Sequence, residues 1–307
     1  MKSRLIALSF VLAGLLSTSC FQEDYSECYN IYKLVMSYKG DGTSEIFPEK
    51  INRVEMYVFD ESAVCVSSTV LPDKDVAAGV TVLPPLPAGD YRIVCVGNTY
   101  DTGVENLSSK DYTKILFAAE DYLNGETVNG NDSLYYASVD YQIKGFSPMI
   151  YEETRTAQFA SSHYDILVEV VNAPSYVGKH PKIELLGVSP QTDFENLAKG
   201  QATDYIMETV HDGVKTTTAR NNIMRHTTHE DVYLKVTGED GTEVALINFA
   251  EHLEKFKLYI NPSKQECLIP FRIEFGTPEL PYPSDDICTD ITITLPSRMI
   301  ELVKPEF

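Results

Sequence analysis

The chain has 307 residues, of which 43% are hydrophobic, and its 45 acidic and 25 basic residues give a formal charge of −20 at pH 7. A surface this acidic repels nucleic acid and anionic lipid headgroups, so neither is an expected partner. The length is sufficient for two domains that each bury a substantial core.

The first twenty residues have the layout of a secretory signal peptide. Lys2 and Arg4 precede an apolar run over residues 5–16, and small residues follow up to Ser19. A basic start, a short apolar run and small residues before the cut are typical of such a signal. About twelve apolar residues are too few to span a membrane as a helix. Residues 1–19 are therefore expected to be removed by cleavage between Ser19 and Cys20.

The cysteine at the cleavage point resembles that of a bacterial lipoprotein signal of the relaxed kind common in Bacteroidota. It predicts that Cys20 is diacylglycerylated and that its new amine is acylated, and each buried CH₂ adds ~0.8 kcal/mol to membrane binding. Residues 20–29 then form an acidic, lipidated leader. Acidic residues in this place resemble the surface-export signal of Bacteroidota lipoproteins, which indicates the outer face of the outer membrane. The alternative is a soluble secreted protein with an ordinary Cys20.

Residues 30–150 carry a period-2 pattern and are expected to form an N-terminal β-sandwich. Gly, Pro, Asp and Ser separate the β-branched and aromatic runs. One short helix is predicted over residues 111–119, where Ile115, Leu116 and Ala119 share a face. The predicted strands cover residues 30–38, 54–60, 63–70, 80–83, 91–97 and 133–143.

The pattern restarts near Arg155, and residues 151–307 are expected to form a C-terminal β-sandwich. Glycines at both ends of residues 238–241 indicate a hairpin turn. The predicted strands cover residues 156–160, 164–172, 182–187, 231–237, 242–248, 267–276 and 291–295. The fold class is therefore all-β, with two consecutive β-sandwich domains.

No arrangement of residues indicates catalysis, a metal or a cofactor. The chain lacks a nucleophile elbow, a phosphate-binding glycine loop and a dinucleotide fingerprint. His226 and His229 have no third ligand nearby and are expected in a solvated loop, and residues 40–45 are interpreted as a turn. Buried free thiols are expected for most of the remaining cysteines, which are Cys28, Cys65, Cys95, Cys267 and Cys288.

One short motif indicates a modification. Asp132-Ser133-Leu134 resembles the Asp-Ser/Thr-apolar site of Bacteroidota protein O-glycosylation, which makes Ser133 a candidate. An unmodified strand start is the alternative. The 19 tyrosines could stack on sugars, although tyrosines on sandwich strands are more often half-buried core residues.

Four strings together resemble the FimB/Mfa-type fimbrial anchor family of Bacteroidota. The first is the lipidated cysteine with its acidic stretch and a second cysteine, over residues 20–28. The second is Arg-Val-Glu-Met-Tyr-Val-Phe-Asp over residues 53–60, and the third is the Leu-Pro-Ala-Gly-Asp-Tyr turn that begins at residue 86. The fourth is a late hairpin and short helix over residues 233–249. The segment from residue 278 to 307 departs from the family pattern.

The resemblance implies a two-domain lipoprotein with transthyretin-like sandwiches, located at the base of a fimbrium. Such a protein attaches the fimbrium to the outer membrane and limits its length. Its implied partners are fimbrillin or accessory fimbrial subunits, bound by strand pairing, and the outer membrane through the lipid. The segment from residue 278 is a candidate for the pairing edge.

Three other functions remain open on sequence alone. A glycan-binding surface lipoprotein would have the same signal and sandwiches. A polymerising fimbrillin subunit would also begin as a lipoprotein, but in the related fimbrillins a protease cuts after an arginine in the N-terminal domain and releases the lipid. A secreted hydrolase is disfavoured because no catalytic set is present.

Overall fold

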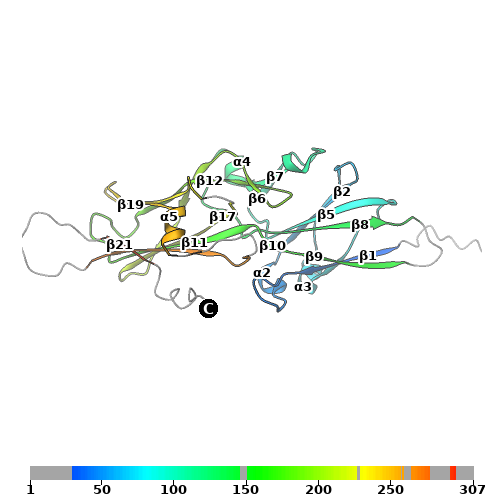
Figure 1. Cartoon of the computed structure of the whole chain (residues 1–307), viewed down its shortest axis with the longest axis horizontal. Coiled ribbons are helices and arrows are strands. Elements are labelled where there is room, and N and C mark those ends of the chain that lie inside the picture. Colours follow the sequence, from blue (N-terminus) through cyan, green and yellow to red (C-terminus); the bar gives the residue numbers. More distant parts are fainter. Residues whose placement is uncertain are drawn as a thin grey trace, which may run out of the picture.

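The computed structural model describes residues 30–145, 151–226, 229–256, 258, 264–276 and 291–294. Figure 1 shows an elongated molecule in which β-strands predominate, with β1, β8 and β9 toward one end and β11, β19 and β21 toward the other. Among the described residues the strands form five sheets, and the helices are short. The expectation of an all-β chain built from sandwiches is confirmed.

The first sandwich consists of a three-stranded and a five-stranded sheet. The three-stranded sheet has the order β4 (Val80–Val82), β1 (Ile31–Ser37), β9 (Glu152–Gln158). The five-stranded sheet has the order β10 (Ala160–Ser161), β8 (Tyr135–Ile143), β5 (Gly89–Gly97), β2 (Val54–Asp60), β3 (Cys65–Val70). Alternate residues of β1 and β2, including Leu34, Met56 and Val58, share one buried cluster between the sheets.

A third layer covers the other face of the five-stranded sheet. It has four strands in the order β14 (Ala198–Lys199), β13 (Gln191–Asp193), β7 (Leu116–Ala119), β6 (Thr102–Glu105). Tyr57 of β2 packs here, with its ring centroid 5.7 Å from that of Phe117 and 5.2 Å from that of Phe194. Strand β2 is therefore buried on both faces, which explains why it is an almost continuous apolar run.

The second sandwich also has two sheets. One has the order β16 (Thr209–His211), β17 (Thr216–Met224), β11 (His163–Val171), β20 (Leu268–Phe275), β21 (Ile291–Thr294). The other has the order β15 (Thr203–Met207), β12 (Lys182–Val188), β18 (Tyr233–Thr237), β19 (Glu243–Asn248). A cluster that includes Ile166, Leu185 and Phe271 fills the space between them. Gly187 has a φ of +76° at the β-bulge of β12, a conformation that favours glycine.

The short helices within the described ranges are α2 (Phe47–Lys50), α3 (Asp73–Ala78), α4 (Glu120–Leu123) and α5 (Phe249–Lys255), together with the 3₁₀ turn η2 (Tyr112–Lys114). The prediction of a helix over residues 111–119 is wrong. Asp111 caps η2 by accepting a hydrogen bond from the Thr113 N–H, and the next residues form β7. Pairing of β7 with both β6 and β13 overrides the helical spacing of its apolar residues.

The two sandwiches share chain segments across the expected division at residue 150. The sequence-based assignment places residues 152–158 in the C-terminal sandwich, whereas β9 pairs in parallel with β1 over seven residues of the first sandwich. Strands β13 and β14, from the second half of the chain, complete the third layer of the first sandwich. β9 is mostly polar, with only Ala157 fully buried, so its membership could not be recognised from an apolar pattern.

Candidate functional site at the junction of the sandwiches

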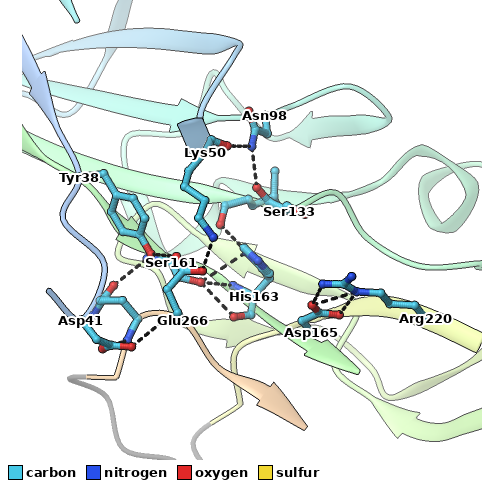
Figure 2. Close-up of polar contacts among 12 residues, drawn as sticks. Tyr38, Asp41, Lys50, Asn98, Ser133, Ser161, His163, Asp165, Arg220 and Glu266 are labelled. Atoms are coloured by element: carbon cyan, nitrogen blue, oxygen red, sulfur yellow. Dashed lines mark hydrogen bonds and ion pairs between the residues drawn. The ribbon is translucent and has the colours of Figure 1, made fainter. Parts of the chain in front are cut away.

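A hydrogen-bonded contact joins the loop after β1 to the residues before β20 (Figure 2). The Asp41 carboxylate accepts the N–H groups of Gln265, at 2.7 Å, and Glu266, at 3.0 Å. The Gln265 side-chain oxygen in turn accepts the N–H of Ser161 at 2.8 Å. Asp41 lies in the loop interpreted as a simple turn, so its role in linking the sandwiches is a feature that the sequence did not reveal.

The Glu266 carboxylate is the centre of this contact. It accepts the Tyr38 hydroxyl at 2.5 Å and forms an ion pair with the Lys50 ammonium at 2.6 Å. Tyr38 is fully buried, and burial together with Glu266 raises its pKa, so the hydroxyl remains a donor. Tyr38 and Lys50 belong to the first sandwich and Glu266 to the second. We call Tyr38, Asp41, Lys50, Gln265 and Glu266 the clasp.

Beside the clasp lies a cleft of about 630 Å³. Residues from both sandwiches form its walls, and most of them are polar or charged. They are Glu49, Lys50, Asn98, Ser133, Tyr135, His163, Asp165, Arg220, Asn221, Asn222, Gln265, Glu266, Cys267 and Leu268. A cleft with convergent polar groups at the junction of two domains is a common location for ligand binding.

Two hydrogen-bonded pairs hold the far wall of the cleft in place. The Arg220 guanidinium binds Asp165 through both carboxylate oxygens, with Nε at 2.9 and 3.0 Å from them. The side-chain amide of Asn222 donates to the Ser133 hydroxyl at 2.9 Å. These pairs connect β17 to β11 and to the start of β8, so the wall is preorganised.

The predicted modification site, Ser133, therefore lies in this cleft. Its neighbour Asp132 accepts hydrogen bonds from the N–H groups of Tyr100 and Asp101 and from the Thr102 hydroxyl. Asp132 thus has a structural role in fixing the turn, which accounts for this part of the motif without modification. O-glycosylation of Ser133 stays a prediction.

The predicted lipidation site, Cys20, and its cleavage partner Ser19 lie outside the described residues, as do Cys28 and Cys288. Cys95 and Cys267 are buried free thiols, and Cys65 is a half-buried one. Within the described ranges, no helix has the length and apolar character that a membrane span requires.

The histidine-rich segment has a structural place in the second sandwich. The rings of His226 and His229 lie 5.6 Å apart, and His226 Nε2 accepts the N–H of Ser189 at 3.0 Å. The prediction that this segment is a solvated loop is wrong for His229, which is buried against Tyr164 and Phe249. In the part of the chain that the structure describes, no three His, Cys, Asp or Glu side chains are placed to hold a metal ion.

The connection between β1 and β2 contains no arginine except Arg53 at its end. After Arg4, the next arginine in the sequence is Arg53, which directly precedes β2. The Arg53 carbonyl accepts the N–H of Asn98 at 2.8 Å, and its guanidinium pairs with Glu55. The exposed residues of the connection are 39, 41–45, 48, 49 and 52, and none of them is an arginine.

Comparison with known proteins gives a family and a fold. A family model described as fimbrillin-A associated anchor proteins Mfa1 and Mfa2 matches residues 25–296. The fold is similar to that of the fimbrial anchor protein Mfa2 from Porphyromonas gingivalis, with a TM-score of 0.64 and 18% identity over 87% of this chain and 97% of that chain. No curated protein sequence matches significantly.

Two proteins from Bacteroides thetaiotaomicron have a similar fold. One is an adhesin candidate, with a TM-score of 0.63 and 16% identity over 88% of this chain and 97% of that chain. The other is a proposed polysaccharide-binding protein, with a TM-score of 0.62 and 12% identity over 81% of this chain and 92% of that chain. At identities of 12–18%, these similarities show a shared fold and nothing about a shared ligand.

Proposed function

The chain belongs to the family of fimbrillin-A associated anchor proteins, and from that membership we propose that it is an outer-membrane lipoprotein which fastens a fimbrium to the cell and limits its length. Membership makes it a fimbrium-associated surface protein of a structural family rather than an enzyme. The observation that carries the anchor role is the match over residues 25–296, which includes both sandwiches.

The first supporting argument concerns β1. Leu34 of β1 is fully buried, and β1 pairs with β4 on one side and β9 on the other. A fimbrillin that polymerises is cut after an arginine in its N-terminal domain, but here the connection after β1 has none before Arg53. An uncut chain keeps β1 covalently joined to the leader, as an anchor requires, and this disfavours the polymerising alternative.

The second argument concerns the membrane attachment. The signal pattern before Cys20 supports lipidation there, with the acidic leader of residues 20–29 between the lipid and β1. The acyl chains supply membrane affinity through burial of CH₂ groups, while the acidic protein surface contributes none on an anionic membrane. We place the protein at the outer face of the outer membrane on the same grounds.

The third argument concerns the edge that receives a fimbrial subunit. The segment from residue 278, the candidate from the sequence, lies outside the described residues except for 291–294, and among the described strands β3 is our candidate. It is an edge strand of the five-stranded sheet, its sequence Cys-Val-Ser-Ser-Thr-Val carries no charge, and Val66 and Val70 are 48% and 45% exposed. Natural edge strands are usually protected by charges, as β9 is by Glu152 and Arg155. An uncharged edge suits pairing with another chain.

The free backbone groups of β3 follow from its register. Leu71 N–H bonds to the Val54 carbonyl, and β3 pairs antiparallel with β2. Hydrogen-bonded and non-bonded positions alternate in such a pair, so the N–H and C=O groups of Ser68 and Val70 face away from β2. The Val70 carbonyl already accepts the Thr69 hydroxyl at 3.3 Å, and the other three groups are available to a strand of the fimbrial subunit.

Deletion of the gene tests the function, and complementation tests the edge. Deletion should release fimbriae into the medium or change their length while the fimbrillin stays intact, and cell-bound fimbriae of normal length would refute anchoring. Complementation with Ser68→Pro removes an outward N–H at little cost to the sheet itself, so it should restore the protein but not the attachment. Ser68→Val keeps the N–H and is the matched control. Full rescue by Ser68→Pro would reject β3 as the receiving edge without rejecting the anchor function.

A further inference from the structure

Two side chains in the wall of the inter-sandwich cleft have polar atoms without partners. Tyr135 is only 3% exposed, and its hydroxyl forms no hydrogen bond with any described residue. His163 Nδ1 lies 2.9 Å from the Leu134 carbonyl, which can only accept, so Nδ1 carries the proton. His163 Nε2 is then a hydrogen-bond acceptor, and no described residue donates a hydrogen bond to it. The two rings contact each other edge to face, with centroids 5.3 Å apart.

Both atoms face the solvent of the cleft, so an occupant with matching groups can replace the water that binds them. The Tyr135 hydroxyl has a hydrogen to donate and His163 Nε2 has a lone pair to accept. Burial lowers the pKa of His163, which keeps the ring neutral near pH 7. The occupant must therefore offer both an acceptor and a donor over a short distance, as a hydroxyl group does.

The charges in the cleft argue for a neutral occupant. Two cations, Lys50 and Arg220, line it, but each is already paired with a carboxylate, Glu266 and Asp165. Glu49 adds a third carboxylate to the wall. The whole chain carries a formal charge of −20, so a free anion is repelled. The remaining lining is rich in amides, including Asn221 and Gln265, which both donate and accept hydrogen bonds.

We propose that the cleft between the two sandwiches is a binding site for a neutral carbohydrate, whose hydroxyl groups bridge Tyr135 and His163. Its volume of about 630 Å³ lies inside the range of ~300–1,000 Å³ typical of small-molecule sites. The site requires both sandwiches, because Tyr135 comes from β8 and His163 from β11. The proposal does not depend on the anchor function, since a chain that holds no fimbrium would still bind the sugar.

The experiment is a saturation-transfer NMR titration of the purified mature chain in detergent. The probes are glucose, mannose, galactose and N-acetylglucosamine, each up to ~10 mM, with glucuronic acid as the anionic comparison. At least one neutral sugar should bind, and glucuronic acid should bind more weakly than glucose. Binding of glucuronic acid alone, or of no neutral sugar, would mean that the cleft takes an anion or holds water only, and would overturn the proposal.

Two conservative variants locate the binding. Tyr135→Phe keeps the ring contacts with Tyr38 and His163 and removes only a hydroxyl without a partner, so the chain should fold normally. It should weaken sugar binding about tenfold, as expected for the loss of one hydrogen bond. Tyr100→Phe removes a hydroxyl from a tyrosine that is 59% exposed and does not line the cleft, and should bind as wild type. Equal binding by both variants would exclude this cleft as the site.

Discussion

The hydroxyl of Tyr38 donates a hydrogen bond of 2.5 Å to the carboxylate of Glu266, a residue 228 positions later in the chain. Tyr38 directly follows β1, and Glu266 directly precedes Cys267 and β20. The contact therefore joins the N-terminal strand of the first sandwich to a central strand of the second. A hydrogen bond with a charged acceptor in a buried place is stronger than an ordinary one.

Tyr38→Phe should lower the free energy of unfolding by about 1–2 kcal/mol, because the ring packing remains while the bond to Glu266 is lost. Urea unfolding followed by tyrosine fluorescence measures the change. Tyr100→Phe, at an exposed position, should leave the midpoint unchanged. A Tyr38→Phe midpoint equal to that of wild type would show that the clasp adds nothing to stability.

Thr43→Arg should convert an uncut chain into a cut one. Thr43 is exposed in the connection between β1 and β2, so an arginine there is accessible to an arginine-specific protease. Limited proteolysis followed by intact-mass measurement should show cleavage after residue 43 in the variant and an intact N-terminal region in wild type. Thr43→Lys adds the same charge and should stay uncut. Rapid cleavage of wild type before residue 54 would contradict the argument that β1 is retained.

Acid should destabilise the second sandwich through two buried histidines. Burial lowers the pKa of both His229 and His252 from 6.5 to about 4. The unfolded chain then binds protons more readily, so the free energy of unfolding is highest above about pH 6.5 and falls toward pH 4, by up to roughly 3 kcal/mol for each histidine. Urea midpoints measured between pH 7 and pH 4.5 should show this fall.

His252→Phe isolates one of these contributions. The new ring can keep the stacking on Phe271, at a centroid distance of 4.0 Å in wild type, but the hydrogen bond to the Pro270 carbonyl is lost. The variant should be less stable at pH 7 by about 1–2 kcal/mol and should lose less stability on acidification than wild type. An unchanged pH dependence would exclude His252 as a titrating group.

Cys20→Ala should abolish lipidation and leave the protein unprocessed or released into the medium. The reason is that the thiol is the site of attachment predicted from the signal pattern before it. Metabolic labelling with a fatty acid, followed by purification, should mark wild type only. Cys28→Ala is the matched control and should be labelled normally. Label on the Cys20→Ala chain would reject the assignment.

Much of the strand content was predictable because apolar and β-branched residues alternate where one face is buried. Residues 54–60 form β2 as predicted. The predicted run at 30–38 extends one residue beyond β1 at each end, and the run at 182–187 stops one residue before the end of β12. β17 was not predicted, since its Thr, Arg and Asn residues hide the alternating pattern, although Thr217, Ala219 and Ile223 are buried.

The junction was less accessible to sequence reasoning. Asp41 and Glu266 are ordinary acids in a chain with 45 of them, and only folding places them together. Ser133 was identified for a different reason, as a modification candidate, and its place in the cleft depends on Asn222, a distant residue of β17. An anchor differs from a polymerising fimbrillin in whether a protease can reach an arginine of its N-terminal domain. The exposure of that arginine cannot be read from sequence, and the contacts of Arg53 became known only from the structure.

The parallel pairing of β1 with β9 has a mechanical consequence. Tension from the proposed lipid tether would enter β1 at Ile31, and the chain leaves β9 at Gln158 toward the second sandwich. In a parallel pair these two points lie at opposite ends, so pulling shears the strands along each other and loads their hydrogen bonds together. Strands pulled from the same end would instead unzip one bond at a time. Resistance to forced unfolding is set by the unfolding rate, and shear geometry slows that step without any gain in equilibrium stability.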